Sequence, residues 1–268
     1  MKANLHVHTN FSDGTKTVKQ INDLAIKNNI DVIAITDHDT LNCVYEIEKL
    51  NTKVKFITGV ELSCKYKSEV IHILGYFKGR PSDDFIQYLR KNEEERLNRC
   101  LKIIENLDKY YGIKISYDEV KKKVDGLIAR PHIAEVICER YGCTFDEAFD
   151  KYIGDDSKAY VPHSVITLQD AIKLLKKNDA LVILAHPILI KTFNYQEIIG
   201  EGFDGIEAYH HDQNKKYTKE IIKFAKRNNL IITGGSDYHG EIIENKFDES
   251  LLKGKCLKLF LDRLNKLS

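Results

Sequence analysis

Short apolar runs in this chain are repeatedly followed by histidine and aspartate side chains. Three such clusters are His6-Val7-His8, Thr36-Asp37-His38 and Ser236-Asp237-Tyr238-His239. Side chains two residues apart in an extended segment point to the same side. His6 and His8 can therefore contact one ligand together, and so can Asp237 and His239. Imidazoles and carboxylates that recur at strand ends indicate a centre of several metal ions. A hydrolase is therefore the leading interpretation.

The apolar runs alternate with helical patterns, which predicts an α/β fold. We expect strands at 5–8, 32–36, 55–61, 70–77, 181–185, 203–208 and 230–233. We expect helices after Thr17, near 44–50, and at 167–178, 213–228 and 255–267. Strands separated by helices of this length imply a parallel sheet. A barrel would collect the loops that follow these strands around one mouth.

The middle of the chain has a different character. A long charged helix is predicted from Ser82 to about Asp108, and the sequences that begin at Ser116 and Thr144 are capping boxes. Pro131 fits the first turn of another helix, through about residue 141. These patterns predict a helical insertion subdomain over 80–155, which contributes to the substrate pocket and interrupts a barrel made of residues 1–79 and 156–268.

Charge and cysteine content exclude some classes of protein. The formal net charge is +1, from 41 basic and 40 acidic residues, which argues against a broad polyanion surface such as duplex DNA requires. No apolar run can span a bilayer, and a predicted ligand at residue six leaves no room for a signal peptide. The six cysteines form no C-x-x-C pair and suit reduced thiols in the cytoplasm. Lysine runs and His163 are expected on the solvated surface.

The polar residues at the predicted strand ends form one candidate set. It comprises His6, His8, Asp13, His38, Glu61, His72, His186, Asp237 and His239. Taken alone, His72 or His186 could be structural, and Glu61 could cap a helix or join an ion pair. Together they offer nitrogen and oxygen ligands suited to Mn²⁺, Fe²⁺ or Zn²⁺. One ion needs only about four protein ligands, so the set implies two or three ions.

On these motifs the sequence resembles the PHP (polymerase and histidinol phosphatase) family of metal-dependent phosphoesterases. The matching elements are His6-Val7-His8, Thr36-Asp37-His38, His186-Pro187 and Ser236-Asp237-Tyr238-His239. The resemblance implies a distorted, TIM-like (β/α)7 barrel with a trinuclear site. It places His6, His8, Glu61 and Asp237 on one metal, and Glu61, His72 and His186 on a second. Asp13, His38 and His239 would hold the third.

A second likeness lies in the predicted insertion. Ala129-Arg130-Pro131-His132 and the later Ala159-Tyr160-Val161-Pro162 resemble a bacterial branch of nucleotide 3′,5′-bisphosphate phosphatases and ribonuclease AM-like 5′-to-3′ exoribonucleases. Arginine can bind two phosphate oxygens at once, so Arg130 would be a catalytic and substrate-binding residue, with His132 beside it. The alternative for Arg130 is a surface salt bridge.

His210 and His211 follow the predicted strand at 203–208 and should lie near the mouth. One of them could protonate a leaving group or contact substrate. The alternative is a loop pair without a role in catalysis.

The combined interpretation is a metal-dependent phosphoesterase in which a hydroxide bridging two metals attacks phosphorus. The expected substrates are small phosphorylated nucleotides, such as nucleoside 3′,5′-bisphosphates, or the 5′ end of short RNA. Histidinol-phosphate phosphatase is the alternative among enzymes, and a non-catalytic metal-binding or regulatory module is the alternative of another class.

Overall fold

The computed structural model describes residues 1–124, 126–162, 165–241 and 245–267, so His163 lies outside the described residues. The chain divides into two compact units. The first unit is Met1–Gln87 with Val165–Ser268, and the second is Tyr88–Ser164. The insertion expected over 80–155 lies in the same part of the chain as the second unit. Its boundaries and its contribution to a substrate pocket stay predictions.

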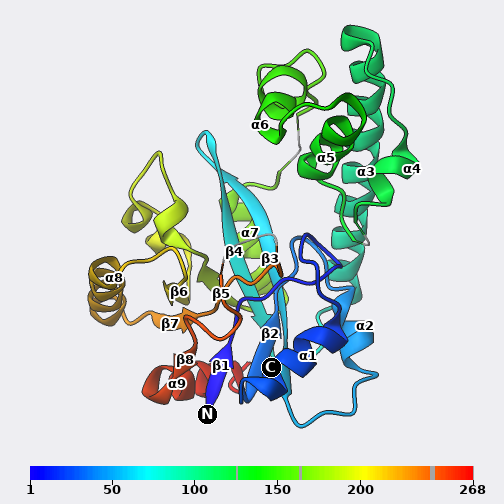
Figure 1. The fold of residues 1–268 in the computed structure, drawn as a ribbon. Helices are drawn as coiled ribbons and strands as arrows, with labels where there is room; N and C mark the ends of the chain where they lie inside the picture. Colours follow the sequence, from blue (N-terminus) through cyan, green and yellow to red (C-terminus); the bar gives the residue numbers. More distant parts are fainter. Residues whose placement is uncertain (125, 163–164, 242–244, 268) are drawn as a thin grey trace. The chain divides into compact units, whose positions relative to one another are not determined.

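The first unit contains a sheet flanked by helices (Figure 1). Its strands are β1 (Lys2–Asn4), β2 (Val32–Ile35), β3 (Lys55–Tyr66), β4 (Glu69–Phe77), β5 (Leu181–Leu184), β6 (Gly205–Tyr209), β7 (Ile231–Gly234) and β8 (Leu252–Lys253). Its helices are α1 (Val18–Lys27), α2 (Cys43–Ile47), α7 (Leu168–Lys177), α8 (Lys215–Arg227) and α9 (Gly254–Leu264). Short 3₁₀ turns η2, η3 and η4 are at Pro187–Leu189, Tyr195–Glu197 and Ile199–Glu201.

Local sequence explains why these elements form. The hydroxyl of Thr17 accepts a bond from the Gln20 backbone N–H, and the Gln20 side chain returns to Thr17, so α1 begins with the capping box its sequence encodes. Strands β2 and β5 are continuous apolar runs in which every residue is buried. That pattern is typical of strands covered on both faces, the condition met inside an α/β barrel.

The strand order is β7-β6-β5-β4-β3-β2-β1-β8. Pairings β1–β2, β2–β3, β5–β6 and β6–β7 are parallel, as predicted. Strand β4 is antiparallel to both β3 and β5, so the prediction of a uniformly parallel sheet is wrong at this strand. The reason is that β3 and β4 form one long hairpin, with no helix between them to return the chain.

The hairpin also changes how two candidate ligands are presented. Glu61 lies in the middle of β3, and His72 lies in β4 opposite Ser63. Neither side chain therefore follows the end of a strand, contrary to the sequence prediction. The N-terminal half of an antiparallel strand meets the same edge of the sheet as the C-terminal ends of its neighbours, and this brings His72 to the mouth.

The first and last strands of the barrel meet beyond their regular ends. Val7 forms a parallel bridge with Tyr238, and the His8 N–H donates to the Tyr238 carbonyl at 3.0 Å. The Leu5 N–H likewise donates to the Gly234 carbonyl at 3.2 Å. The strand predicted at 5–8 is thus an extended segment that follows β1 and pairs with the segment after β7. The described residues form a nearly closed, distorted TIM-like barrel, with β8 as a short antiparallel addition beside β1.

The second unit is helical. Helix α3 (Asp83–Tyr111) begins in the first unit, and α4 (Tyr117–Lys121), α5 (Arg130–Tyr141) and α6 (Phe145–Ala148) follow it, with a π-helical turn η1 (Phe149–Ile153). Both predicted capping boxes, at Ser116 and Thr144, are present. Leu107, Val120 and Ile137 are completely buried in a common apolar core. The π-helical turn is the element here that the sequence pattern did not predict.

In the described residues, no helix has both the length and the apolar character needed to cross a membrane. All six cysteines are free thiols. The Sγ atoms of Cys138 and Cys143 lie 3.8 Å apart, and both partly buried side chains pack against the apolar core of the second unit.

Candidate metal centre

Glu61 is the middle of the cluster that the barrel assembles. Its side chain is completely buried. Atom Oε2 lies 3.1 Å from Nε2 of His6 and 3.1 Å from Nε2 of His8. Atom Oε1 lies 2.9 Å from Nε2 of His186 and 3.1 Å from Nδ1 of His72. With His38, whose Nδ1 lies 3.3 Å from Oε2, one carboxylate faces five imidazoles, three at Oε2 and two at Oε1.

Asp237 enters the cluster from the segment after β7. Its Oδ1 lies 3.2 Å from Nε2 of His6 and 3.0 Å from Nε2 of His8. The backbone of Asp237 has a φ of 51°, in the left-handed region that is sparsely populated by residues other than glycine. The Asn245 side chain donates to the Asp237 carbonyl at 3.0 Å and thereby supports this conformation.

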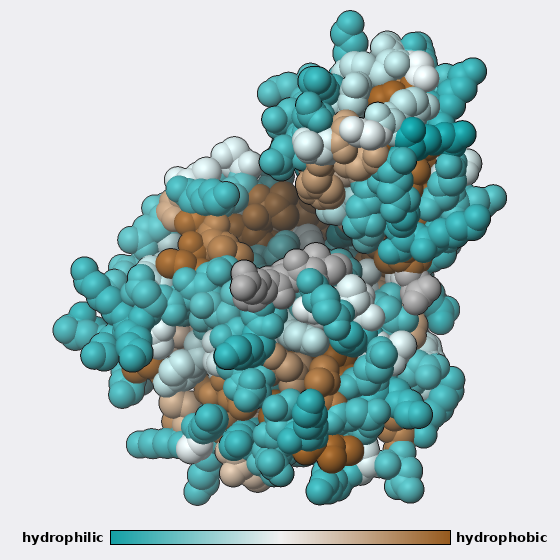
Figure 2. Space-filling view, viewed as in Figure 1, coloured by the Kyte–Doolittle hydropathy of each residue, from teal (hydrophilic) through white to brown (hydrophobic). Residues whose placement is uncertain are grey.

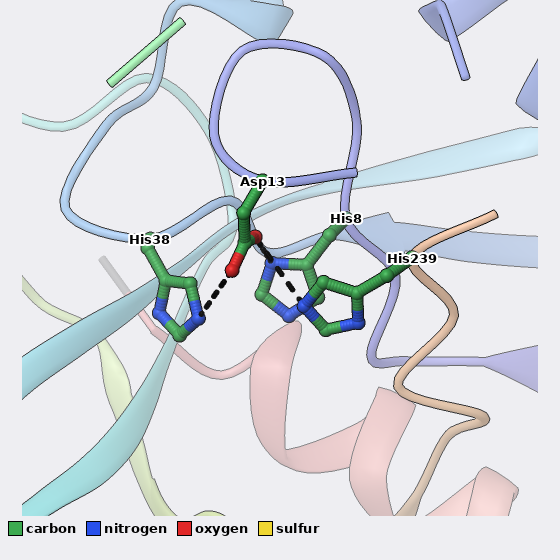
Figure 3. Close-up of side chains that lie close together, drawn as sticks. All are labelled: His8, Asp13, His38 and His239. Carbon is green, nitrogen blue, oxygen red and sulfur yellow. Dashed lines mark ion pairs between the residues drawn. The ribbon is translucent and has the colours of Figure 1, made fainter. Parts of the chain in front are cut away.

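Asp13, on the loop before α1, is the centre of a third group of side chains. Figure 3 shows its carboxylate pointing toward the rings of His8, His38 and His239. The Asp13 oxygens lie 3.5 Å from Nδ1 of His8, 3.5 Å from Nε2 of His38 and 3.3 Å from Nε2 of His239. His38 also lies 3.3 Å from Oε2 of Glu61, so this group is continuous with the centre around Glu61.

The close packing of these groups shifts their pKa values. Burial by itself would raise the pKa of Glu61 and Asp237, but the histidines that face them hold both well below the usual range. Burial would likewise lower the pKa of His8, but the nearby carboxylates of Asp237 and Glu61 raise it to about 10. Burial lowers the pKa of His38 to about 4, against the opposing charges of Glu61 and Asp13. The carboxylates are thus held ionised in a site where positive charge is favoured.

Several atoms of this cluster would suit a cation. Within the described part of the chain, the buried atoms His8 Nε2, Asp13 Oδ1, His38 Nδ1 and Asp237 Oδ1 have no hydrogen-bond partner of suitable geometry. Buried polar atoms are normally satisfied, and ionised carboxylates are acceptors only. Nitrogen and oxygen lone pairs that converge without protein donors fit divalent transition metals, so the residues present fit the metals that the sequence implies.

The described residues bring the nine candidate ligands into overlapping groups. Their ligand atoms lie within 4.8 Å of one another in the sets His6–His8–Glu61–Asp237, His8–Asp13–His38–His239 and His38–Glu61–His72. His186 adjoins the last set through its 2.9 Å contact with Glu61. The assignment of ligands to individual ions stays a prediction. A further set, His210–His211–Asp212, comes from consecutive loop residues after β6.

Sequence reasoning missed two buried carboxylates that support the candidate ligands. Glu207, on β6, contacts His6 Nδ1 at 3.1 Å. Asp37 accepts from the Thr9 N–H and hydroxyl, both at 2.7 Å, and from the Ser12 hydroxyl at 2.7 Å. The available signal for Glu207 was an acidic residue inside an otherwise apolar β-type run.

His210 and His211 play different parts. His210 is buried, and its Nε2 lies 3.2 Å from Oδ2 of Asp237. His211 directs Nδ1 to the Ser236 carbonyl at 3.1 Å, so it contacts the backbone of the segment that carries Asp237. A direct role for either residue with substrate stays a prediction.

A cavity opens beside the centre within the first unit, with a volume of about 180 Å³. Its lining combines candidate ligands with Glu69 and with apolar side chains that include Val70 and Leu189; the candidate ligands are His38, Glu61, His72, His186 and Asp237. Val70 and Leu189 are 50% and 43% exposed, and Figure 2 shows apolar surface beside the β3–β4 hairpin. The cavity therefore brings apolar side chains beside candidate metal ligands, a combination common in sites for small organic ligands.

Arg130 lies in the second unit, at the first position of α5. Its guanidinium pairs with Asp155, donates to the Ile153 carbonyl at 3.2 Å, and lies 5.4 Å from the Tyr160 ring centroid and 5.7 Å from that of Phe149. The side chain is nevertheless 26% exposed. The salt bridge that was the alternative interpretation is present, and it leaves the Arg130 side chain partly exposed.

His132 has a structural contact that the sequence did not predict. Its Nδ1 accepts a bond from the Ala129 N–H at 3.0 Å, so it reaches back to the start of α5 in the way that a capping-box glutamate does. Because Nδ1 is the acceptor, the proton of neutral His132 is on Nε2.

Comparison with known proteins supplies a family and several relatives. Residues 4–233 match the family model described as the PHP domain. The chain is 28% identical over 247 residues to a 5′-3′ exoribonuclease of Haemophilus influenzae, covering 89% of this chain and 90% of the relative. It is 26% identical over 251 residues to a 3′,5′-nucleoside bisphosphate phosphatase of Chromobacterium violaceum, covering 88% and 86%.

Two solved structures superpose on this chain over nearly its whole length. A protein of Bifidobacterium adolescentis, described as a proposed metal-dependent phosphoesterase, superposes with a TM-score of 0.79 at 26% identity, covering 97% of this chain and 96% of that one. A Chromobacterium violaceum structure described as an amidohydrolase, with bound sulfate, also has a TM-score of 0.79, at 23% identity and 98% and 97% coverage. The second likeness supports the fold alone.

Proposed function

This chain belongs to the PHP domain family, and we propose that it is a metal-dependent phosphoesterase acting on small phosphorylated nucleotides or on the 5′ end of short RNA. The observation that carries the proposal is the position of Glu61, a buried carboxylate shared between His6 and His8 on one oxygen and His72 and His186 on the other. A buried carboxylate surrounded by imidazoles would be costly in a barrel interior without bound cations, whereas these donor atoms fit neighbouring divalent metal ions.

We propose that two to three Mn²⁺, Fe²⁺ or Zn²⁺ ions are held by the nine residues described above. When bound, such ions supply the Lewis acidity that lowers the pKa of water and offsets the charge of a phosphate. The chain contributes ionised Glu61 and Asp237, whose histidine neighbours keep them deprotonated at neutral pH. His210, through its contact with Oδ2, restricts how Asp237 can rotate.

The nucleotide substrate is supported by two features. Relatives named for a nucleoside bisphosphate phosphatase and an exoribonuclease cover most of the chain. Arg130 presents a planar guanidinium fixed by Asp155, Ile153 and two aromatic rings, an arrangement that reduces the entropy lost when a phosphate binds. We propose that Arg130 binds a substrate phosphate and that Nε2 of His132 donates a second bond to it.

A cytoplasmic location would agree with six free thiols.

The test is a substrate panel with Mn²⁺-loaded protein. It should contain a nucleoside 3′,5′-bisphosphate, a 5′-phosphorylated short RNA, histidinol phosphate and a generic aryl phosphodiester. We expect release of phosphate or mononucleotide from one of the first two at a kcat/KM far above that for the others. Preference for histidinol phosphate would replace the nucleotide assignment. Turnover of none of them by protein with full metal content would identify a binding module instead.

A further inference from the structure

Glu207 is a completely buried carboxylate that contacts two parts of the candidate centre from behind. It lies on β6, and its Oε1 is 3.1 Å from Nδ1 of His6. Its Oε2 accepts the backbone N–H of His186 at 2.8 Å. Both histidines in turn point Nε2 at Glu61, at 3.1 Å for His6 and 2.9 Å for His186. Glu207 therefore stands opposite Glu61 across the two histidines.

The contact with His6 determines which ring nitrogen is available to a metal. Oε1 of the completely buried Glu207 lies at hydrogen-bond distance from Nδ1, and a carboxylate oxygen acts there as an acceptor. An acceptor at Nδ1 requires that this nitrogen carry its proton. The lone pair of a neutral His6 then belongs to Nε2, the nitrogen that faces Glu61 and Asp237.

The contact with His186 acts on the backbone. His186 has a φ of 21°, a sparsely populated conformation for a residue with a side chain. The bond from its N–H to Glu207 opposes relaxation of this segment, and Nε2 of His186 stays directed at Glu61. One carboxylate thus positions a side chain in the first case and a strained backbone in the second.

We propose that Glu207 is a positioning residue of the metal centre, which fixes the His6 tautomer and the His186 backbone so that both Nε2 atoms are presented to metal. The inference rests on the metal centre of the proposed function but not on its substrate. Outer carboxylates of this kind typically change metal affinity by 10–100-fold when removed.

Glu207→Gln is the sharpest variant because an amide has only one acceptor oxygen. If that oxygen stays with the His186 N–H, the amide NH₂ faces Nδ1 of His6 and favours a proton on Nε2, where metal should bind. If the oxygen turns to His6, the His186 N–H faces another donor inside the barrel. In both orientations, we expect Zn²⁺ affinity to fall by about 10–100-fold.

The experiment measures Zn²⁺ affinity by competition with a chromophoric chelator, with no assay of activity. Asp204→Asn is the matched control, since Asp204 precedes the same strand and accepts the Val182 N–H at 2.8 Å without contacting a histidine. We expect the control to bind Zn²⁺ within about twofold of the unaltered protein. In ¹⁵N spectra of zinc-loaded protein, Nδ1 of His6 should carry a directly bonded proton, and this signal should be shifted or lost in Glu207→Gln.

A double-mutant cycle with His6→Ala separates positioning from general stabilisation of the barrel. If Glu207 acts through His6, then Glu207→Gln should weaken Zn²⁺ binding much less in the His6→Ala background than in the native one. Equal losses in both backgrounds, or unchanged affinity in a folded Glu207→Gln protein, would overturn the inference. Glu207→Asp, which keeps the charge and withdraws it by one methylene, serves if the glutamine variant does not fold. Failure of the unaltered protein to bind metal would instead overturn the proposed function.

Discussion

Glu61 and His186 approach each other to 2.9 Å between Oε1 and Nε2, although 125 positions separate them in the chain. The second oxygen of the same carboxylate faces His6 and His8, which come from the start of the chain. The position of Glu61 on a strand buried in the sheet fixes both oxygens at once. The centre is therefore built outward from the barrel interior, and its ligands depend on one another.

We expect the reconstituted protein to retain two to three transition-metal ions per chain by elemental analysis, because nine candidate ligands exceed what one ion requires. Glu61→Gln should lose at least one of them, since it removes the charge shared by both sides of the centre. Glu69→Gln is the control: this carboxylate binds the Lys191 and Thr192 N–H groups, both at 2.9 Å, and should leave metal content unchanged. One ion or fewer in the unaltered protein contradicts a multinuclear centre.

Removal of metal should lower the melting temperature. A ligand that binds only the folded state at a free concentration of one hundred times Kd contributes about 2.7 kcal/mol per site to the free energy of unfolding. For a chain of this size, that corresponds to a shift of several degrees. Scanning calorimetry before and after chelation, and again after Mn²⁺ is restored, measures the shift. No difference among the three scans would show that the cluster binds metal weakly or not at all.

Asp237→Asn and His8→Ala should each reduce turnover by more than about a hundredfold, because a direct ligand should matter at least as much as an outer one. Both side chains lie at the barrel mouth, so circular dichroism should show the fold retained. Asp204→Asn is a suitable comparison of the same chemical change, since Asp204 accepts the Val182 N–H at 2.8 Å and belongs to none of the candidate metal groups described above. Near-normal turnover in either of the first two variants removes that residue from the metal site.

Much of the fold follows from sequence, and the part that does not has a physical explanation. The apolar runs at 32–35 and 181–184 predicted β2 and β5 because strands buried on both faces have no polar positions to confuse the pattern. The β3–β4 hairpin escaped prediction because its turn contains Lys67, with a φ of 54°. Glycine or asparagine normally marks such a turn, and a lysine gives no signal.

Part of the candidate site could likewise be predicted from the sequence, and part could not. Clustered motifs such as His6-Val7-His8 were visible because ligands two residues apart share one side of a strand. Glu207 was not recognised because its partners, the His6 ring and the His186 N–H, are remote in sequence. His132 was associated with phosphate through its motif, whereas its bond to Ala129 depends on where α5 begins.

Arg130→Ala should keep full metal content but lower kcat/KM for a nucleoside 3′,5′-bisphosphate by about a hundredfold, the value of a charge-assisted bidentate contact. Arg130→Lys should recover only part of the loss, since an ammonium lacks the planar fork. Arg140→Ala is the control from the last turn of the same helix, where the guanidinium pairs with Glu119.

The choice of substrate assigns the role of Arg130. If it binds the phosphate that is not cleaved, a generic aryl phosphodiester should be much less affected by the substitution. If it binds the phosphate that is cleaved, both substrates should suffer alike. Unchanged kinetics with every substrate would mean that the bond with Asp155 is its main function.

The roles of the two ring nitrogens of His132 can be tested separately by substitution. His132→Asn places an oxygen near the position of Nδ1 and should keep the bond from the Ala129 N–H, whereas His132→Ala should lose about 1 kcal/mol of unfolding free energy with that bond. Both variants lack Nε2, so both should lower kcat/KM for the nucleotide substrate. Denaturant unfolding and steady-state kinetics measure the two effects separately. Full activity in His132→Asn would limit His132 to starting the helix.

The bridge between Val7 and Tyr238 has a consequence for the way the protein is made. His6 and His8 leave the ribosome more than two hundred residues before Asp237 and His239. Until then a nascent chain offers isolated histidines that can bind metal loosely but cannot hold it in the arrangement of the finished barrel. Correct metal loading is therefore an event of late folding, and the completeness of the centre reports that the two ends of the barrel have met.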